Sequence, residues 1–234
     1  VIVDAVRYKD GGQNNLANQL SSNYKLYAAQ NPDYIDAPFL TNHDQNRISG
    51  MLKGDFSKLK LAASLYILAE GVPFMYYGEE IGLMGAKPDE QIRTPMLWNT
   101  AGKDKMQTTW IESKYNKNTI PVKQQEKDET SLLQYYKRLI RLKTSHSALY
   151  EGRMTPVWTG KPELISWVME SDSEKVFVVH NLEESPVTVD VPEELNEEIF
   201  NLIFATYPDT KVEGKQLTIS ALGTGVFRLA DFEK

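Results

Sequence analysis

The sequence predicts an α/β region over residues 1–149, followed by an all-β region, an antiparallel β-sandwich, over residues 150–234. Up to residue 149, long helix-like segments alternate with short apolar runs, whereas the segments beyond it are short, β-rich and separated by turns. Two apolar runs in the first region lie about 35 residues apart, which is the repeat of a βα unit. Seven short strands in the last ~80 residues are typical of a sandwich.

The two apolar runs of the first region are Ala37–Thr41 and Pro73–Tyr77. Both resemble parallel strands that are buried on both faces. Between them, apolar residues at three- and four-residue steps predict a helix over Ser57–Glu70. Asp55 or Ser57 can cap its start, and a Gly and a Pro directly after it are stop signals.

A long segment, Gly78–Asp128, has no clear periodicity, and a loop of this length is usually functional or a small excursion of its own. A second helix with a broad apolar face is predicted over Thr130–Thr144. The strands predicted in the all-β region are Met154–Trp158, Leu164–Glu170, Lys175–Asn181, Val187–Val191, Leu202–Thr206, Gln216–Ser220 and Gly225–Leu229. Turn residues separate them, as expected for an antiparallel arrangement.

Composition excludes several classes of function. The chain has 26 basic and 32 acidic residues, a net charge of −6, which argues against nucleic-acid binding. It has no Cys, so disulfides and Cys-ligated zinc are excluded, and its three His are widely spaced. No apolar run is long enough for a membrane helix. The N-terminus shows no signal peptide and no initiator Met, so a processed or cut product is expected.

A polar cluster follows the first apolar run. Asn42, His43, Asp44 and Arg47 lie just past the C-terminal end of a predicted strand, where parallel βα folds place active sites. Charged and imidazole groups are costly to bury and useful around a polar ligand. A helix N-cap supplied by Asn42 or Asp44 explains the same pattern. On pattern alone both interpretations stay open.

Four stretches of the chain resemble the α-amylase family of glycoside hydrolases, in the family's order. Residues 39–47, with Asn-His-Asp followed by Gln-x-Arg, resemble its last conserved motif. Residues 71–82 resemble its eighth barrel strand and the following turn, residues 92–98 the Arg-x-Pro-Met-x-Trp stretch, and residues 131–140 the eighth helix. The β-rich end is similar to the family's C-terminal sandwich in position and size only.

The resemblance implies the last part of a (β/α)₈ TIM barrel, about strands seven and eight, plus the C-terminal β domain. Family members are retaining enzymes that act on α-1,4-glucans or maltooligosaccharides. Neither their nucleophile motif nor their acid/base motif precedes Asn42, and only 41 residues stand upstream of it, too few for six βα units. The parent protein is therefore expected to be a glycoside hydrolase, and the isolated chain is expected to be inactive.

The resemblance also implies roles for individual residues. Asp44 matches the third acid, which stabilises the transition state, and His43 donates a hydrogen bond to the same sugar. The other residues expected to bind substrate are Asn42, Arg47, Arg93 and Trp98. The two arginines could orient carboxylates or reach sugar hydroxyls, and Arg47 could equally be a surface residue. Trp98 could stack on a sugar ring or pack within its loop.

No cofactor and no metal are expected in this chain, although calcium is possible in the parent enzyme. The expected partners are an α-glucan or maltooligosaccharide, and either the missing N-terminal part of the barrel or a second copy, paired through exposed strand edges. No nucleic acid and no membrane is expected, and a secreted or periplasmic parent is favoured over a cytoplasmic one. The alternatives are a non-catalytic carbohydrate-binding or interaction module, and an α-glucosidase or glucosyltransferase of the same family.

Overall fold

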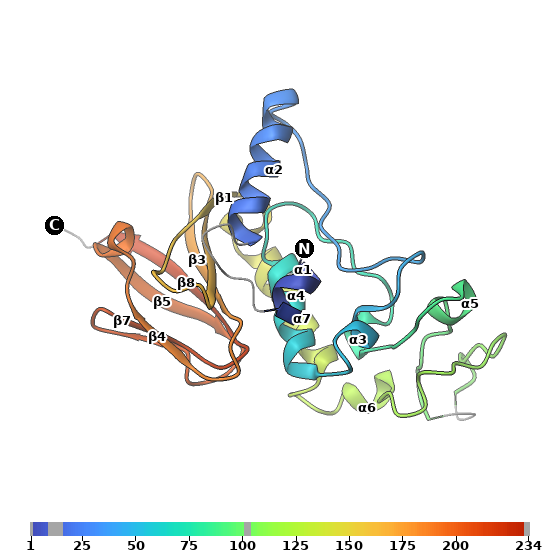
Figure 1. Ribbon diagram of the computed structural model, residues 1–234. Coiled ribbons are helices and arrows are strands. Elements are labelled where there is room, and N and C mark those ends of the chain that lie inside the picture. Colours follow the sequence, from blue (N-terminus) through green and yellow to red (C-terminus); the bar gives the residue numbers. More distant parts are fainter. Residues whose placement is uncertain (1, 9–15, 101–103, 232–234) are drawn as a thin grey trace.

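The computed structural model describes residues 2–8, 16–100 and 104–231. Helices and loops fill the first part of the chain and strands the last, so the predicted fold class is confirmed (Figure 1). The helices are α1 (Ile2–Tyr8), α2 (Leu16–Gln30), α3 (Ile48–Met51), α4 (Phe56–Ile67), α5 (Asp89–Ile92), α6 (Val122–Gln125), α7 (Leu132–Ser145) and α8 (Ser147–Glu151). Two single 3₁₀ turns are η1 (Glu79–Ile81) and η2 (Glu193–Leu195).

The two apolar runs of the first region lie side by side. The amide of Val72 donates to the carbonyl of Asp36 at 2.9 Å, and that of Phe74 donates to the carbonyl of Pro38, also at 2.9 Å. Equal steps of two along both runs identify a parallel pair. Neither run forms a regular strand, because proline in each run removes a backbone donor from the ladder.

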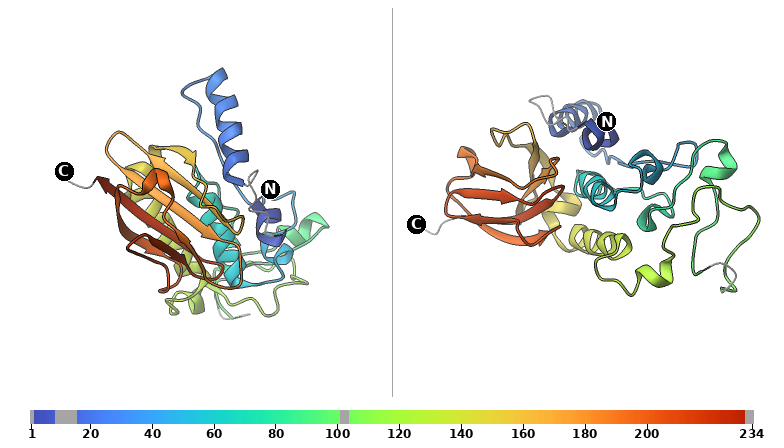
Figure 2. Two further views of the ribbon diagram at one scale, coloured as in Figure 1. Left: turned by 60° about the vertical axis from the view of Figure 1, so that its left-hand side comes forward. Right: turned by 60° about the horizontal axis from the view of Figure 1, so that its bottom comes forward.

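Helix α4 follows the first run and is buried along most of its length. Its predicted cap is confirmed, since the Asp55 carboxylate accepts from the amides of Ser57 at 3.0 Å and Lys58 at 3.2 Å. The helix ends at Ile67, three residues before the predicted end. Helix α7 packs beside it, and both lie between the sandwich and the long loop region (Figure 2).

The all-β region consists of two antiparallel sheets. Its strands are β1 (Arg153–Pro156), β2 (Leu164–Glu170), β3 (Lys175–Asn181), β4 (Val187–Asp190), β5 (Glu198–Ala205), β6 (Lys211–Glu213), β7 (Gln216–Ile219) and β8 (Thr224–Asp231). The order is β1-β2-β3-β8-β5 in the five-stranded sheet and β4-β7-β6 in the other. A core cluster between the sheets confirms the predicted sandwich. Strand β6 was not predicted, and β5 begins four residues before its predicted start.

The strands β2 and β3 of the five-stranded sheet are buried on both faces. Along β2, Ile165, Trp167 and Met169 belong to the core that the helices share, whereas Leu164 and Val168 belong to the core between the sheets. Such alternation follows from the two-residue period of a strand. One face of the sheet therefore packs against the helices of the first region.

The helix-side core contains residues from both sides of the predicted boundary between residues 149 and 150. Leu65 of α4 and Tyr135 of α7 belong to the same cluster as Trp167 of β2 and Val178 of β3. The hydrophobic core does not divide between residues 149 and 150. The domain boundary there stays a prediction from the sequence.

Candidate functional site

The polar cluster after the first run forms a tight turn. The Asn42 side-chain oxygen accepts from the Asp44 amide at 2.9 Å, and the Asn42 carbonyl accepts from the Gln45 amide at 3.2 Å. This arrangement is an Asx turn, in which a side chain replaces a backbone acceptor. Asn42 thus caps a turn and not a helix, because α3 begins only at Ile48, with Arg47 at its N-cap. The turn presents the side chains of His43 and Asp44.

Arg93 connects this turn to the loop that follows the second run. Its Nη2 lies 3.0 Å from Oδ1 of Asp44, and its Nε donates to the carbonyl of His43 at 3.0 Å. The imidazole Nε2 of His43 lies 3.3 Å from the other oxygen of Asp44. The structure thus brings together four of the predicted site residues, Asn42, His43, Asp44 and Arg93.

Asp89 is a site residue that the sequence analysis did not select. It opens the short helix α5, and its Oδ2 lies 2.8 Å from Nη2 of Arg93, the nitrogen that also holds Asp44. A hydrogen bond from Lys87, then the charges of Lys87 and Arg93, lower the pKa of Asp89. The spacing Asp-x-x-x-Arg places both side chains on one face of a helical turn, and this spacing is the sequence signal for the pair.

The carboxylate of Asp44 is oriented but still accessible. The side chains of His43 and Asp44 are 64% and 62% exposed, and that of Arg93 is 40% exposed. Ion pairs this exposed contribute little to stability. The consequence of the Arg93 contacts is geometric, because they fix the direction of the Asp44 carboxylate and the carbonyl of His43 together.

Arg47 lies beneath the site and not in it. It is only 1% exposed, its Nη1 donates to the carbonyl of Tyr77 at 2.7 Å, and its guanidinium lies 4.5 Å from the ring centre of Tyr76 and 4.7 Å from that of Tyr77. Burial lowers the pKa of Arg47, partly opposed by the two tyrosines and Glu80. Its Nε and Nη2 have no hydrogen-bond partner among the described residues. The structure therefore places the Arg47 guanidinium against the second run, and its contact with substrate stays a prediction.

The same two tyrosines hold the loop that carries Arg93. The Tyr76 hydroxyl donates to the carbonyl of Ile92 at 3.2 Å, and the Tyr77 hydroxyl donates to that of Thr94 at 2.9 Å. The residues on either side of Arg93 are thus tied to the second run, which Arg47 supports from below.

Trp98 lies further along the same loop. Its amide donates to the side-chain oxygen of Gln107 at 3.1 Å, and Gln107 also donates to the carbonyl of Met96 at 2.9 Å. The indole is partly exposed. Trp98 takes part in none of the hydrogen bonds and ion pairs recorded above for the turn at 42–45 and Arg93.

Glu79 carries a carboxyl group and follows closely after the second run. Glu79 is buried, and its Oε1 accepts from the hydroxyls of Tyr66 at 3.0 Å and Tyr136 at 2.9 Å. Burial raises the pKa of Glu79 to about 7, although both hydroxyls favour its charged form. Glu79 thus joins α4 to α7 and does not face the exposed turn at 42–45.

Neither a metal cluster nor a membrane-spanning helix occurs within residues 2–8, 16–100 and 104–231. No group of three or more His, Cys, Asp or Glu side chains in these ranges is placed to hold a metal ion. None of their helices has the length and apolar composition needed to cross a membrane.

Comparison with known families covers most of the chain. Residues 5–152 match the family model "Alpha amylase, catalytic domain", and residues 164–226 match "Alpha-amylase SusG C-terminal domain". The chain therefore belongs to the α-amylase family, glycoside hydrolase family 13, and the resemblance noted in the sequence is confirmed.

Individual relatives agree with this assignment. Alpha-amylase 3 of Dictyoglomus thermophilum is 38% identical over 194 residues, which are 79% of this chain and 39% of that protein. Alpha-amylase SusG of Bacteroides thetaiotaomicron is 33% identical over 224 residues, 92% of this chain and 32% of that protein. The chain thus spans well under half the length of these curated relatives.

Solved structures show the same fold. An α-amylase from H. orenii matches with a TM-score of 0.83 at 33% identity, over 98% of this chain and 48% of that chain. Amy13B of Eubacterium rectale matches with a TM-score of 0.87 over 99% of this chain and 46% of that chain. Its identity is 23%, so this second likeness concerns the fold alone.

Proposed function

We propose that the turn at 42–45 and the segment 87–93 form one edge of the sugar-cleavage subsite of a retaining α-glucan hydrolase. The substrate is an α-1,4-glucan or maltooligosaccharide. Asp44 holds hydroxyls of the sugar at the point of cleavage and stabilises its oxocarbenium-like form, and His43 donates a hydrogen bond to the same sugar. The observation that carries the proposal is the contact of Arg93 with both Asp44 and His43, inside the stretch that matches the catalytic domain.

Arg93 is a positioning residue in this proposal. A transition-state stabiliser works by being oriented before the reaction, so that no reorganisation is needed when charge develops. Arg93 supplies that orientation through two nitrogen atoms, and Tyr76 and Tyr77 supply it for Arg93. Arg47 acts one layer deeper, through the same tyrosines, and Trp98 is the aromatic surface of the loop that meets the glucan.

The 234-residue chain by itself is not a catalyst in this proposal. Retaining hydrolysis needs two carboxyl groups ~5–5.5 Å apart, one as nucleophile and one as proton donor. Two carboxyl groups of this edge, those of Asp44 and Asp89, are both bound to Nη2 of Arg93. The lowered pKa of Asp89 keeps it charged, so it has no proton to donate. The nucleophile and the acid come from elsewhere in the parent protein.

The two apolar runs are the edge where the rest of the barrel joins. Phe74 and Val72 are 61% and 50% exposed, and Phe39 and Met75 are also exposed. Exposed apolar strands pair with further strands when these are offered. The partner of this edge is the N-terminal part of the barrel or, in its absence, a second copy of the chain.

The alternatives within the family, an α-glucosidase or a glucosyltransferase, differ from an α-amylase in the reaction and not in the residues of this site. Relatives at 33% and 38% identity are α-amylases, which supports hydrolysis of α-glucans over glucosyl transfer. The proposal needs no organic cofactor and no metal in this chain. It is compatible with a calcium site elsewhere in the parent protein. We favour a secreted or periplasmic parent over a cytoplasmic one.

Two assays test the proposal. The 234-residue chain is expected to release no reducing sugar from soluble starch. In the whole protein, Asp44→Asn is expected to lower kcat at least ~10²-fold with little change in KM, because the lost interaction exists mainly in the transition state. Asp33→Asn, a change of an exposed carboxylate in the loop before the first run, is the matched control.

Two outcomes contradict the proposal. Turnover by the chain alone that scales with its concentration and disappears in Asp44→Asn rules out the need for further carboxyl groups. A near-normal kcat with only a raised KM in the whole protein shows that Asp44 merely binds substrate.

A further inference from the structure

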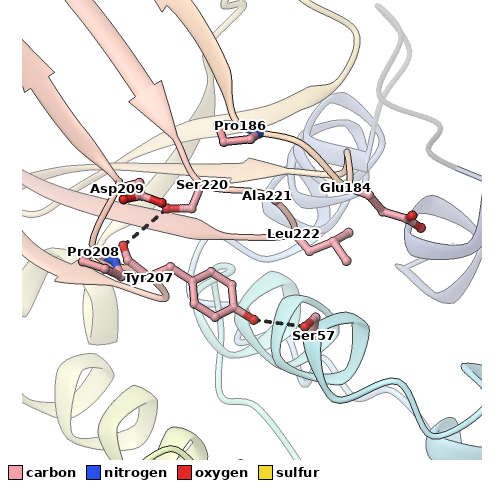
Figure 3. A pocket seen from close by; sticks show the side chains of 9 residues that line it. All are labelled: Ser57, Glu184, Pro186, Tyr207, Pro208, Asp209, Ser220, Ala221 and Leu222. Carbon is pink, nitrogen blue, oxygen red and sulfur yellow. Dashed lines mark hydrogen bonds between the residues drawn. The ribbon is translucent and has the colours of Figure 1, made fainter.

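A cavity of about 500 Å³ lies where the β-sandwich meets the start of helix α4, apart from the turn at 42–45 (Figure 3). Three turns of the sandwich and the first turn of α4 form its walls. Tyr207 reaches across from the sandwich, and its hydroxyl donates to the Ser57 hydroxyl at 3.1 Å. The cavity therefore exists only while the two regions are packed together.

The sandwich side of the cavity is held by a buried amide. The Asn181 side chain is inaccessible to solvent, and its Nδ2 donates to the carbonyls of Ser185 at 2.8 Å, Ile219 at 3.2 Å and Ser220 at 3.0 Å. Ser185 and Ser220 belong to two of the three turns, and Ile219 is the last residue of β7. The third turn is joined to them by a hydrogen bond of 2.8 Å between the hydroxyls of Thr210 and Ser220. The walls are thus preformed, as in most ligand pockets.

The wall also contains a strained residue. Leu222 has a φ of 46°, in the left-handed region that disfavours side chains other than Gly. Its amide donates to the carbonyl of Glu183 at 2.7 Å, which holds the strained turn in place. Strain of this kind is concentrated at ligand sites, where it keeps a wall in a required shape.

The lining selects against ions. Glu184 and Asp209 lie at opposite ends of the cavity, with Tyr207 and Leu222 between them (Figure 3). No group of three or more His, Cys, Asp or Glu side chains among the described residues is placed to hold a metal ion, and the cavity has no basic residue in its lining to hold an anion. The ammonium group of Lys58 is paired with Glu184 at 3.1 Å.

The lining suits a neutral, extended ligand rich in hydroxyl groups. An aromatic ring offers a large apolar face, and the apolar face of a pyranose fits such a surface, here that of Tyr207. Carboxylates are strong acceptors for sugar hydroxyls at each end, and Pro186 and Pro208 add apolar surface without donors.

We propose that this cavity binds a segment of α-glucan, at a site separate from the cleavage subsite that contains Asp44. The choice of α-glucan rests on the proposed function, whereas the preference for a neutral polyhydroxyl ligand rests on the lining alone.

The experiment is a titration of the 234-residue chain with maltoheptaose, followed by backbone NMR shifts and calorimetry. Shifts are expected at residues 207–210 and 220–222. Tyr207→Ala is expected to weaken binding at least about tenfold, because it removes a central aromatic surface. Tyr207→Phe keeps the ring and is expected to stay within about threefold of the wild type. Tyr150→Ala, a change of an exposed tyrosine on α8, is the matched control.

Two further arms separate the possible failures. Asp44→Asn is expected to leave this binding unchanged. Binding that disappears in Asp44→Asn but survives in folded Tyr207→Ala overturns the inference and leaves the proposed function standing. A response to calcium chloride with none to maltoheptaose also overturns it. If Tyr207→Ala does not fold, Asp209→Asn repeats the test. An unchanged affinity of Asp209→Asn for maltoheptaose, with no shifts at residues 207–210, also overturns the inference.

Discussion

The buried carboxyl of Glu79 makes the stability of this chain depend on pH in a direction that can be stated in advance. Glu79 lies between α4 and α7 and accepts hydrogen bonds from Tyr66 and Tyr136. Its pKa rises from 4.5 to about 7, chiefly because burial disfavours the charged form. Glu80 adds to this rise, while the two tyrosines and Arg47 oppose it. We predict that Glu79→Gln, which cannot ionise, removes this pH dependence.

The magnitude follows from the two pKa values. Between pH 4.5 and 7, the folded chain keeps a proton that the unfolded chain has already lost, so stability falls as pH rises. The contribution of the neutral carboxyl is complete below about pH 4.5 and is lost by pH 7 and above. A difference of 7 − 4.5 between the pKa values corresponds to roughly 3 kcal/mol. Relative to the wild type, Glu79→Gln should therefore gain most of that free energy between pH 5 and pH 8.

Urea unfolding at a series of pH values, followed by tryptophan fluorescence, measures this difference. Other titrating groups cancel in the comparison, among them His180, whose pKa burial lowers to about 3. Tyr136→Phe removes a donor that favours the charged form, so it should move the pH-dependent range upward. A difference between Glu79→Gln and the wild type that stays constant from pH 5 to pH 8 would refute the reasoning.

Two further predictions concern the site and the apolar edge. In the whole protein, Arg93→Lys should lower kcat by ~10- to 100-fold with little change in KM, because one ammonium cannot replace two directed contacts; an unchanged kcat would show that Arg93 does not orient Asp44. The 234-residue chain should self-associate at micromolar concentration in analytical ultracentrifugation, through the apolar runs 37–41 and 73–77; a monomer with strong amide protection in both runs would contradict this.

The sequence predicts well those elements whose pattern is local. The bounds of β2 and β3 agree with the predicted ones because continuous apolar runs end at clear turns. Strand β6 escapes prediction because Lys211–Glu213 is short and polar and is defined only by its pairing with β7. Helix α2 was not predicted because its apolar residues form only a weak stripe.

The loop region after residue 78 is held in place by contacts between residues that are far apart in the sequence. Gln125 donates to the carbonyl of Ile81 at 2.9 Å, and Asn116 donates to that of Met84, also at 2.9 Å. Such bonds between a side chain and the backbone leave no periodic pattern in the sequence, so they cannot be predicted from it. The same holds for the site, where the motif at 42–44 is visible in the sequence, but the contact of Asp44 with Arg93 joins residues 49 positions apart.

The core shared by helices and sheet has a consequence for how this family can be rearranged. The two family models divide the chain between residues 152 and 164. Trp167 and Val178 are inaccessible to solvent and belong to the core that the five-stranded sheet shares with the helices. A recombination event that exchanges the C-terminal segment must therefore supply matching side chains on both partners at once. The C-terminal segment is therefore inherited together with the helices against which its five-stranded sheet packs.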